Sequence, residues 1–294
     1  MDKVIRVTAG KGQVRAFFVQ NTEMLEKARE IHQLSPVAAA ALGRMMAATA
    51  MMGQMLKGMG QKITLRMNGG GPLGTVLCVA DDEGNVKGLV EYPQAETENL
   101  TPEKLNVGAA VGTDGEITVI KDLGMKVPYI GTYPISTGEI AEDLTAYFMH
   151  SEQQPASVGL SVKVNVDYHI LVSGGFIIQV LPDISEEQLR LLEAKLICLP
   201  PLSELFENLN TPEAVMERVL EGFDPVITEE KQVAFHCDCS QERMEEALIS
   251  LGVKEITSII EEDGHAEIIC HFCRKAYRFN EMELSKLTQE AKSS

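Results

Sequence analysis

The chain has no tryptophan, and aromatic residues make up only 5% of its 294 positions. It also lacks an apolar run that is long and uncharged enough to suit a membrane-spanning helix. The nearest candidate, residues 36–56, reads PVAAAALGRMMAATAMMGQML. Arg44 lies inside it, and alanine and methionine outnumber leucine there. We therefore expect a buried central helix and no membrane segment.

A secretory signal is lacking as well. The first residues, MDKVIRVTAGKGQVRAFFVQ, contain no continuous apolar region of the kind that signal peptides carry. We therefore expect a cytoplasmic protein, in a compartment where thiols stay reduced.

Basic residues are few: 26 Lys and Arg stand against 43 Asp and Glu, for a net charge of −17. Nucleic acid is therefore not an expected partner, because phosphate backbones bind basic surfaces. Residues 183–232 are the most acidic part of the chain, with 12 acidic and 4 basic positions. Because this part also has little apolar mass, we predict a helical linker of marginal stability.

Cysteine is scarce, but four of the six cysteines lie in two short motifs. Cys237 and Cys239 form a Cys-x-Cys pair, and Cys270 and Cys273 form a Cys-x-x-Cys pair. Two close pairs of thiolates supply the tetrahedral ligand set that Zn²⁺ favours. We predict one Zn²⁺ ion bound by these four residues, in a small unit that needs the metal to fold.

The residues alone leave two interpretations of this site open. A permanently structural zinc site is the simpler one. However, Cys-x-Cys departs from the usual spacing of structural zinc ligands, and Cys-x-x-Cys is readily oxidised. Each pair is thus a potential disulfide as well as half of a metal site, and oxidation would remove the metal and unfold the unit.

The remaining candidate ligands and thiols have simpler expected roles. His236, His265 and His271 lie near the motifs, but four cysteines already complete a zinc shell. Cys78 and Cys198 stand in the apolar runs TVLCVAD and KLICLP, so we expect both to be buried as small hydrophobic residues.

Nothing in the sequence indicates an enzyme. The glycine-rich NGGGPLG lacks the spacing of a phosphate-binding loop and is predicted to be a turn between strands. His150 and Glu152 lie close in sequence without forming a recognisable nucleophile-and-base pair. The methionines between Met45 and Met59 are expected to pack in the core.

The order of predicted elements indicates an α+β protein in three parts. Residues 1–182 form a mostly antiparallel sheet domain around the central helix. Residues 183–232 are the acidic helical linker, and residues 233–294 are a small α+β zinc-binding domain with two helices and a β-hairpin. Three helix starts have suitable N-cap residues, namely Asn21, Ser35 and Ser185.

Taken together, these motifs resemble the 33 kDa chaperonin family, the redox-regulated heat shock chaperones of bacteria. CDCS, ERMEEALISLG and CHFCRKAYRF are similar to the family's C-terminal zinc signature. SPVAAAALGRMMAA, NGGGPLGTV, GEIAEDLTAYFMHSEQQPASVGLSV and GGFIIQVLPD look like its N-terminal blocks in the same order. The resemblance covers nearly the full chain.

The resemblance implies an ATP-independent holdase that is inactive while the four cysteines bind zinc. Under oxidation with heat, disulfides Cys237–Cys239 and Cys270–Cys273 would form, zinc would leave, and the C-terminal domain and linker would unfold. The activated protein would form homodimers and hold unfolding client proteins through residues 1–182, on a surface that the sequence does not locate.

A second hypothesis is a zinc-ribbon interaction module with a purely structural metal site. In that case the reduced, zinc-bound form is the active one, and cysteine substitutions abolish binding to one fixed partner.

Overall fold

The computed structural model describes residues 1–101 and 104–291 of the chain. The chain divides into two units, Met1–His236 and Cys237–Ser294. Each unit has its own cluster of buried apolar side chains. Within the described ranges, no helix has both the length and the apolar composition needed to cross a membrane.

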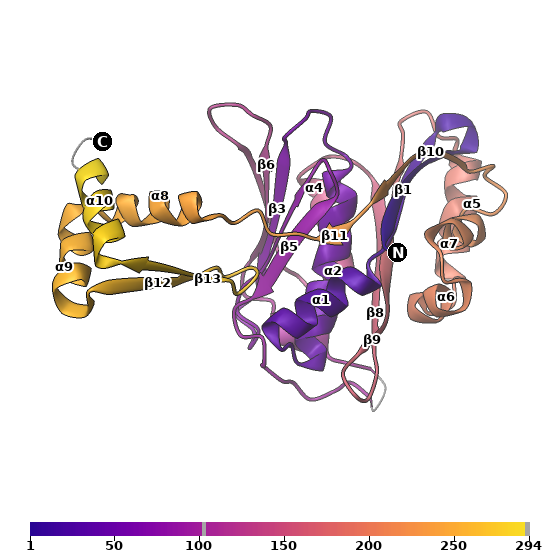
Figure 1. The fold of residues 1–294 in the computed structure, drawn as a ribbon. Helices are drawn as coiled ribbons and strands as arrows, with labels where there is room; N and C mark the ends of the chain where they lie inside the picture. The colour runs from indigo at the N-terminus through magenta and orange to yellow at the C-terminus, as the bar shows by residue number, and fades with distance from the viewer. Residues whose placement is uncertain (102–103, 292–294) are drawn as a thin grey trace. The chain divides into compact units, whose positions relative to one another are not determined.

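The first unit is built on two sheets (Figure 1). The five-stranded sheet is antiparallel throughout, in the order β10-β1-β2-β9-β8. Its strands are β1 (Lys3–Ala9), β2 (Val14–Gln20), β8 (Ala156–Val164), β9 (Ile170–Val180) and β10 (Val226–Gln232). The six-stranded sheet has the order β11-β5-β4-β3-β6-β7, and only its β11–β5 pair is parallel. Its strands are β3 (Lys62–Asn68), β4 (Val76–Asp81), β5 (Asn85–Val90), β6 (Glu116–Asp122), β7 (Tyr129–Pro134) and β11 (Ala234–Phe235). The predicted α+β fold with mostly antiparallel sheets is confirmed.

Helix α2 (Pro36–Gly53) packs against strands of both sheets. Its start matches the sequence prediction, because the Ser35 hydroxyl accepts a hydrogen bond from the Ala38 N–H at 3.2 Å. Every residue of the helix is buried except Pro36 and Arg44. The predicted core packing of the methionines is confirmed for Met45, Met46, Met51 and Met52. It was wrong for Met59, which is 96% exposed, and Met55 is only half-buried. Small alanine side chains and a buried methionine surface together let one helix fill the space between two sheets.

Helix α1 (Thr22–His32) begins differently from the prediction. Asn21 occupies the N-cap position but its side chain does not cap the helix. Its amide oxygen instead accepts a hydrogen bond from the Ser173 hydroxyl at 2.8 Å. A carboxylate oxygen of Asp2 accepts the Met24 N–H at 2.6 Å. A side chain that is distant in the sequence therefore accepts the hydrogen bond at the start of the helix. Asn21 does occupy the N-cap position, but the prediction that its side chain caps the helix was wrong.

Three further helical segments precede the acidic segment: η1 (Gly10–Gly12), α3 (Val107–Val111) and α4 (Ile140–His150). The glycine-rich loop of residues 68–74 joins β3 to β4, as predicted.

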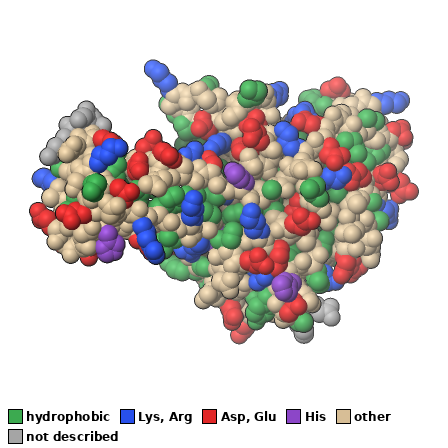
Figure 2. All heavy atoms as spheres, viewed as in Figure 1, with side chains coloured by type: hydrophobic (Ala, Val, Ile, Leu, Met, Phe, Trp, Pro, Cys, Tyr) green, Lys and Arg blue, Asp and Glu red, His purple; other side chains and the backbone are tan. Residues whose placement is uncertain are grey.

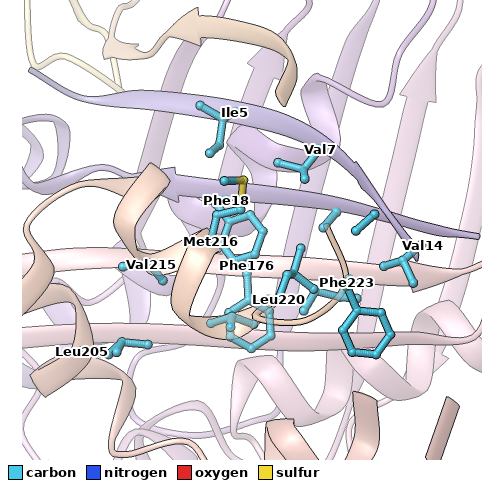
Figure 3. Close-up of a cluster of buried hydrophobic side chains, with 14 of the residues drawn as sticks. Ile5, Val7, Val14, Phe18, Phe176, Leu205, Val215, Met216, Leu220 and Phe223 are labelled. Atoms are coloured by element: carbon cyan, nitrogen blue, oxygen red, sulfur yellow. The ribbon is translucent and has the colours of Figure 1, made fainter. Parts of the chain in front are cut away.

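Three helices of the acidic segment cover one face of the five-stranded sheet: α5 (Glu186–Ile197), α6 (Leu202–Leu209) and α7 (Pro212–Val219). The Ser185 hydroxyl caps α5 as predicted. Figure 3 shows the apolar cluster between helices and sheet, with side chains from both sides. It includes Ile5, Val7, Phe18, Phe176, Leu205, Phe206, Val215, Met216, Leu220 and Phe223. Acidic side chains lie over the outer surface of these helices (Figure 2). The predicted helices are therefore present, and they belong to the same unit as the sheet.

Two strands after these helices were not predicted. Strand β10 pairs with β1, and the two-residue β11 pairs with β5. The sequence of β10, VITEEKQ, leaves six of its seven side chains exposed, so it has no alternation of buried and exposed positions. It is held by backbone pairing and by ion pairs such as Lys3–Glu230 at 3.1 Å, and neither leaves a periodic signal in the sequence.

Cys78 and Cys198, the two cysteines outside the motifs, differ in their burial. Cys78 is fully buried on β4, as predicted. Cys198 is exposed, so its predicted burial was wrong. It follows the last residue of α5, where Leu196 and Leu199 pack against the apolar cluster while Ile197 is 83% exposed. The apolar run KLICLP straddles a helix end, and only one side of it reaches the core.

The second unit contains α8 (Gln241–Leu251), α9 (Val253–Asp263), β12 (His265–Ile269), β13 (Ala276–Asn280) and α10 (Glu281–Ala291). Strands β12 and β13 form an antiparallel hairpin, and Gly264 ends α9 in the left-handed conformation. The two predicted helices and the hairpin are confirmed. The buried core is small; it consists of Leu248, Ile256, Cys270, Tyr277, Phe279, Leu284 and Leu287.

Candidate metal centre

The second unit brings the four motif cysteines together. Their sulfur atoms all lie within 4.8 Å of one another. The Sγ atoms of Cys237 and Cys270 are 3.7 Å apart, and those of Cys239 and Cys273 are 3.3 Å apart. A tetrahedral site with Zn–S bonds of about 2.3 Å has sulfur atoms about 3.8 Å apart. The cluster therefore has the size of an all-thiolate zinc site.

Local backbone structure explains how each pair is presented. The Cys-x-x-Cys pair lies in the turn between β12 and β13. The Arg274 N–H donates to the Cys270 carbonyl at 2.8 Å, and the Cys270 N–H donates to the Lys275 carbonyl at 2.9 Å. Arg274 adopts a left-handed φ of 60°, which closes the turn. This tight loop points both sulfur atoms to the same side.

The Cys-x-Cys pair stands just before α8. Ser240 caps that helix through a hydrogen bond from the Arg243 N–H. The intervening Asp238 pairs with the Arg243 guanidinium at 2.7 Å. Cys239 immediately precedes this cap, so the start of α8 fixes the backbone of the Cys-x-Cys pair.

The four thiols are electrostatically unequal. Burial raises the pKa of Cys237 and also that of Cys273. Burial acts in the same direction on Cys239, but hydrogen bonds from Tyr277 and the neighbouring thiols outweigh it and lower the pKa of Cys239 to about 7. Several thiolates at these distances repel one another strongly. A divalent cation bound among them removes that repulsion, so the chemistry of the donor set fits Zn²⁺.

Histidine does not enter the cluster, which among the described residues consists of cysteines alone. His265 Nδ1 lies 2.8 Å from the Asp263 carbonyl, at the end of α9. His236 belongs to the other unit, where its backbone N–H bonds to Val86.

Sequence reasoning missed one residue of the site, Tyr277. Its hydroxyl donates a hydrogen bond to the Cys239 sulfur at 3.1 Å. Tyr277 lies on β13 opposite Ile268, and its side chain belongs to the buried core. The only sequence signal was an aromatic residue in a predicted hairpin, which says nothing about a partner 38 residues away.

Comparisons with known proteins agree with this site. The family model described as Hsp33 protein matches residues 2–280. The 33 kDa chaperonin of Alkaliphilus oremlandii is 55% identical over 287 residues, which cover 98% of this chain and 96% of that protein. The 33 kDa chaperonin of Clostridioides difficile is 46% identical over 98% of this chain and 99% of its own length.

A solved structure is also similar. The crystal structure of the 33 kDa chaperonin (heat shock protein 33 homolog) from Thermotoga maritima superposes with a TM-score of 0.90 at 32% identity, covering 99% of each chain. The predicted resemblance is thereby confirmed, and with it the prediction of a chaperone in place of an enzyme. The family model, the full-length relatives and the shared fold establish that this chain belongs to the Hsp33 family of 33 kDa chaperonins.

Proposed function

We propose that this chain is an ATP-independent holdase whose activity is switched by oxidation of its four-cysteine cluster. The observation that carries the proposal is the gathering of all four sulfur atoms within 4.8 Å, in a unit with a small apolar core. Such a unit depends on its metal, because zinc binding contributes about 10–16 kcal/mol in small zinc peptides. Chemistry at the sulfur atoms therefore decides whether the unit is folded.

In the resting state, Cys237, Cys239, Cys270 and Cys273 hold one Zn²⁺ ion. An all-sulfur tetrahedral site is typical of Zn²⁺, and the distances between the sulfur atoms support this choice. A zinc-thiolate site requires reduced cysteines, which supports a cytoplasmic location for the resting protein.

Oxidation would form the disulfides Cys237–Cys239 and Cys270–Cys273. In the folded cluster, the sulfur contacts of 3.7 Å and 3.3 Å join one motif to the other. Once the metal leaves and the unit unfolds, however, contacts across some thirty residues are lost and only cysteines of the same motif stay close. The local pairing is therefore the one that an unfolded unit retains.

The client surface is the face of the five-stranded sheet that α5–α7 cover, together with the apolar faces of those helices. Its strand residues include Ile5, Val7, Phe18 and Phe176, all of them buried at rest. The chain reaches the helices from the cysteine unit through the two-residue β11 and through β10, six of whose seven side chains are exposed. Loss of the cysteine unit would free this end of the chain, loosen the helices and expose apolar surface. That surface would hold unfolding client proteins and support homodimer formation.

The test uses the full reduced chain loaded with Zn²⁺. Hydrogen peroxide is added at raised temperature, zinc release is followed with a chromophoric chelator, and light scattering reports aggregation of an unfolding client. We expect zinc release and suppression of scattering to appear together and to be reversed by a dithiol reductant with added Zn²⁺.

A matched control is Cys198→Ser, which removes an exposed thiol outside the cluster and should behave as the unmodified chain. Retention of zinc after oxidation would contradict the proposal. So would full activity of the reduced form, which is the result that a zinc-ribbon interaction module predicts.

A further inference from the structure

A pocket of about 410 Å³ lies in the first unit beside the start of α1. Its walls come from the N-terminal segment, from α1, from the turn before β5 and from residues 232–235. A volume of this size suits a small organic molecule. All of its wall residues belong to the first unit, so the pocket is separate from the cysteine cluster.

One wall of the pocket carries the carboxyl group of Asp2, which is only 3% exposed. A carboxylate oxygen accepts the Met24 N–H at 2.6 Å, and the Asp2 carbonyl accepts the Val233 N–H at 3.1 Å. In the described part of the chain, no ion pair includes Asp2. Burial raises the pKa of Asp2 to about 6 despite the backbone hydrogen bonds. The ionised group is therefore a buried charge with no cation in contact.

The charged groups around this carboxyl do not supply that cation. Lys27 of α1 is engaged by Phe235, since its ammonium donates to the Phe235 carbonyl at 3.1 Å and lies 5.8 Å from the centre of the ring. The Met1 amine pairs with Glu23 at 3.1 Å, and both groups are largely exposed. Glu83, on the turn before β5, adds a further exposed acid to the pocket. In a chain with a net charge of −17, such a pocket attracts cations.

The rest of the pocket wall is partly apolar. Residues 232–235 contribute no charged side chain, and the side chains of Met24, Val233 and Phe235 all line the pocket. A ligand that matches these walls carries one positive charge for the carboxylate and a short apolar body for the three side chains. A primary ammonium on a short aliphatic chain has this chemistry, because it donates hydrogen bonds to a carboxylate and buries its carbon atoms.

We propose that this pocket binds a small organic ammonium ion, with its charge on the Asp2 carboxylate and its apolar chain against Met24, Val233 and Phe235. Because residues 232–235 lead from β10 to the cysteine unit, a bound ligand would also hold that segment on the first unit. The binding itself goes beyond the proposed redox switch, and only an effect of the ligand on activation would rest on it.

The probe is n-pentylammonium, titrated into the full, reduced, zinc-loaded chain and followed by calorimetry. 1-Pentanol, which has the same chain and no charge, is the neutral comparison. We expect the ammonium ion to bind at least about tenfold more tightly than the alcohol, because only the ion pairs with the buried carboxylate. Equal affinities, or no binding of the ammonium ion, would overturn the proposal.

The pH dependence of binding identifies the carboxyl group. An ammonium ion binds the ionised form of Asp2, so it releases a proton wherever that group is partly protonated. With a pKa of about 6, the affinity should rise about fourfold from pH 5.5 to pH 7.5 and then level off. Titrations in two buffers with different heats of ionisation measure the released proton directly. An affinity that is the same at both pH values would mean that another group binds the probe, and the proposal would be wrong.

Asp2→Asn keeps an acceptor for the Met24 N–H and removes the charge. We expect this variant to lose about tenfold in ammonium affinity at pH 7.5 and to show neither pH dependence nor proton release, with an unchanged circular dichroism spectrum. Asp183→Asn, at an exposed position outside the pocket, is the matched control and should bind the probe as the unmodified chain does. Undiminished ammonium affinity in Asp2→Asn would refute the assignment.

This proposal and the proposed function fail separately. Ammonium binding is measured on the reduced chain without oxidant or client, so a chain that peroxide does not activate would leave the pocket assignment standing. Absence of ammonium binding, in turn, would overturn the pocket assignment alone and leave the redox switch as proposed.

Discussion

At the scale of single residues, Asp2 is unusual because its carboxyl group is buried and has a raised pKa. It is 3% exposed, and burial raises its pKa from 3.8 to about 6 despite hydrogen bonds from the backbone N–H groups of Glu23 and Met24. A folded-state pKa above the unfolded one means that ionisation disfavours folding. The contribution of Asp2 to the free energy of unfolding is therefore most favourable below about pH 4. It falls as the pH rises to about 6 and does not change further above that value.

Asp2→Asn should therefore remove a pH dependence of stability. An amide keeps an oxygen that accepts from the Met24 N–H, but it cannot ionise. We expect the variant to gain stability relative to the unmodified chain between about pH 4 and pH 7, by at most about 3 kcal/mol. Urea unfolding followed by circular dichroism at both pH values measures the difference. Asp183→Asn, at an exposed position, is the control, and an equal response of the two variants would refute the explanation.

Individual residues differed in how far the sequence could reveal their roles. The four cysteines were predictable because each pair is local, and two close pairs of thiols have few other uses in a reduced compartment. Tyr277 and Asp2 act on partners 38 and 22 positions away, and neither belongs to a motif. Ordinary residue types that act over such distances become visible only when the fold brings them to their partners.

At the scale of elements, the cover formed by α5–α7 depends on a few buried side chains. Phe206 of α6 is fully buried in the cluster beneath these helices. It fits against backbone: a Cβ at Gly174 of β9 would lie 2.6 Å from the Phe206 ring. A glycine in the strand therefore makes room for the aromatic ring of the helix.

Phe206→Ala should weaken this cover by about 3–5 kcal/mol, because it removes a large buried side chain and leaves a cavity. We expect faster hydrogen exchange over residues 186–219 and measurable suppression of client aggregation without oxidant. Leu191→Ala, at a side chain that is 48% exposed on α5, is the control and should leave both measurements unchanged. Unaltered exchange in Phe206→Ala would show that the helices are held by other contacts.

Elements with strong periodicity or caps were predictable, and elements held by backbone pairing alone were not. Helices α2 and α5 start at the serine N-caps that the sequence showed, and α8 and α9 are the two helices predicted for residues 233–294. Strand β10 has no buried face, so its place beside β1 follows from the antiparallel edge that β1 offers. The acidic composition of residues 183–232 likewise concealed an apolar side, because the charges lie on the outer face of each helix.

At the scale of the whole molecule, the two units should differ in their dependence on metal. Cys273→Ser removes one of the four proposed ligands and changes no residue of the first unit. We expect weaker zinc binding and loss of protected structure in residues 237–291, with the cooperative melt of residues 1–182 retained. Competition with a chelator of known affinity and hydrogen exchange measure the two effects. Cys198→Ser is the matched control, and loss of the melt of residues 1–182 in Cys273→Ser would contradict the separation of units.

Removal of zinc under reducing conditions separates the two steps of the proposed switch. A strong chelator takes away the free energy of metal binding, so residues 237–291 should unfold even at low temperature. Helices α5–α7 have a separate apolar cluster with the sheet, built around side chains such as Leu205, Phe206 and Val215. We therefore expect residues 186–219 to stay protected from hydrogen exchange at low temperature and to lose protection on warming, before residues 1–182 melt.

Because the switch has two steps, we expect an oxidant alone to activate the protein only weakly. Loss of the metal frees one end of the chain, but the cluster beneath α5–α7 still has to be overcome, and heat or another unfolding condition supplies that step. Suppression of client aggregation should therefore follow the exchange of residues 186–219 and not zinc loss itself. Adding Zn²⁺ back at low temperature should restore the protection of residues 237–291. Simultaneous loss of protection in both segments at low temperature would mean that the helices have no stability of their own, and that a single event controls the whole switch.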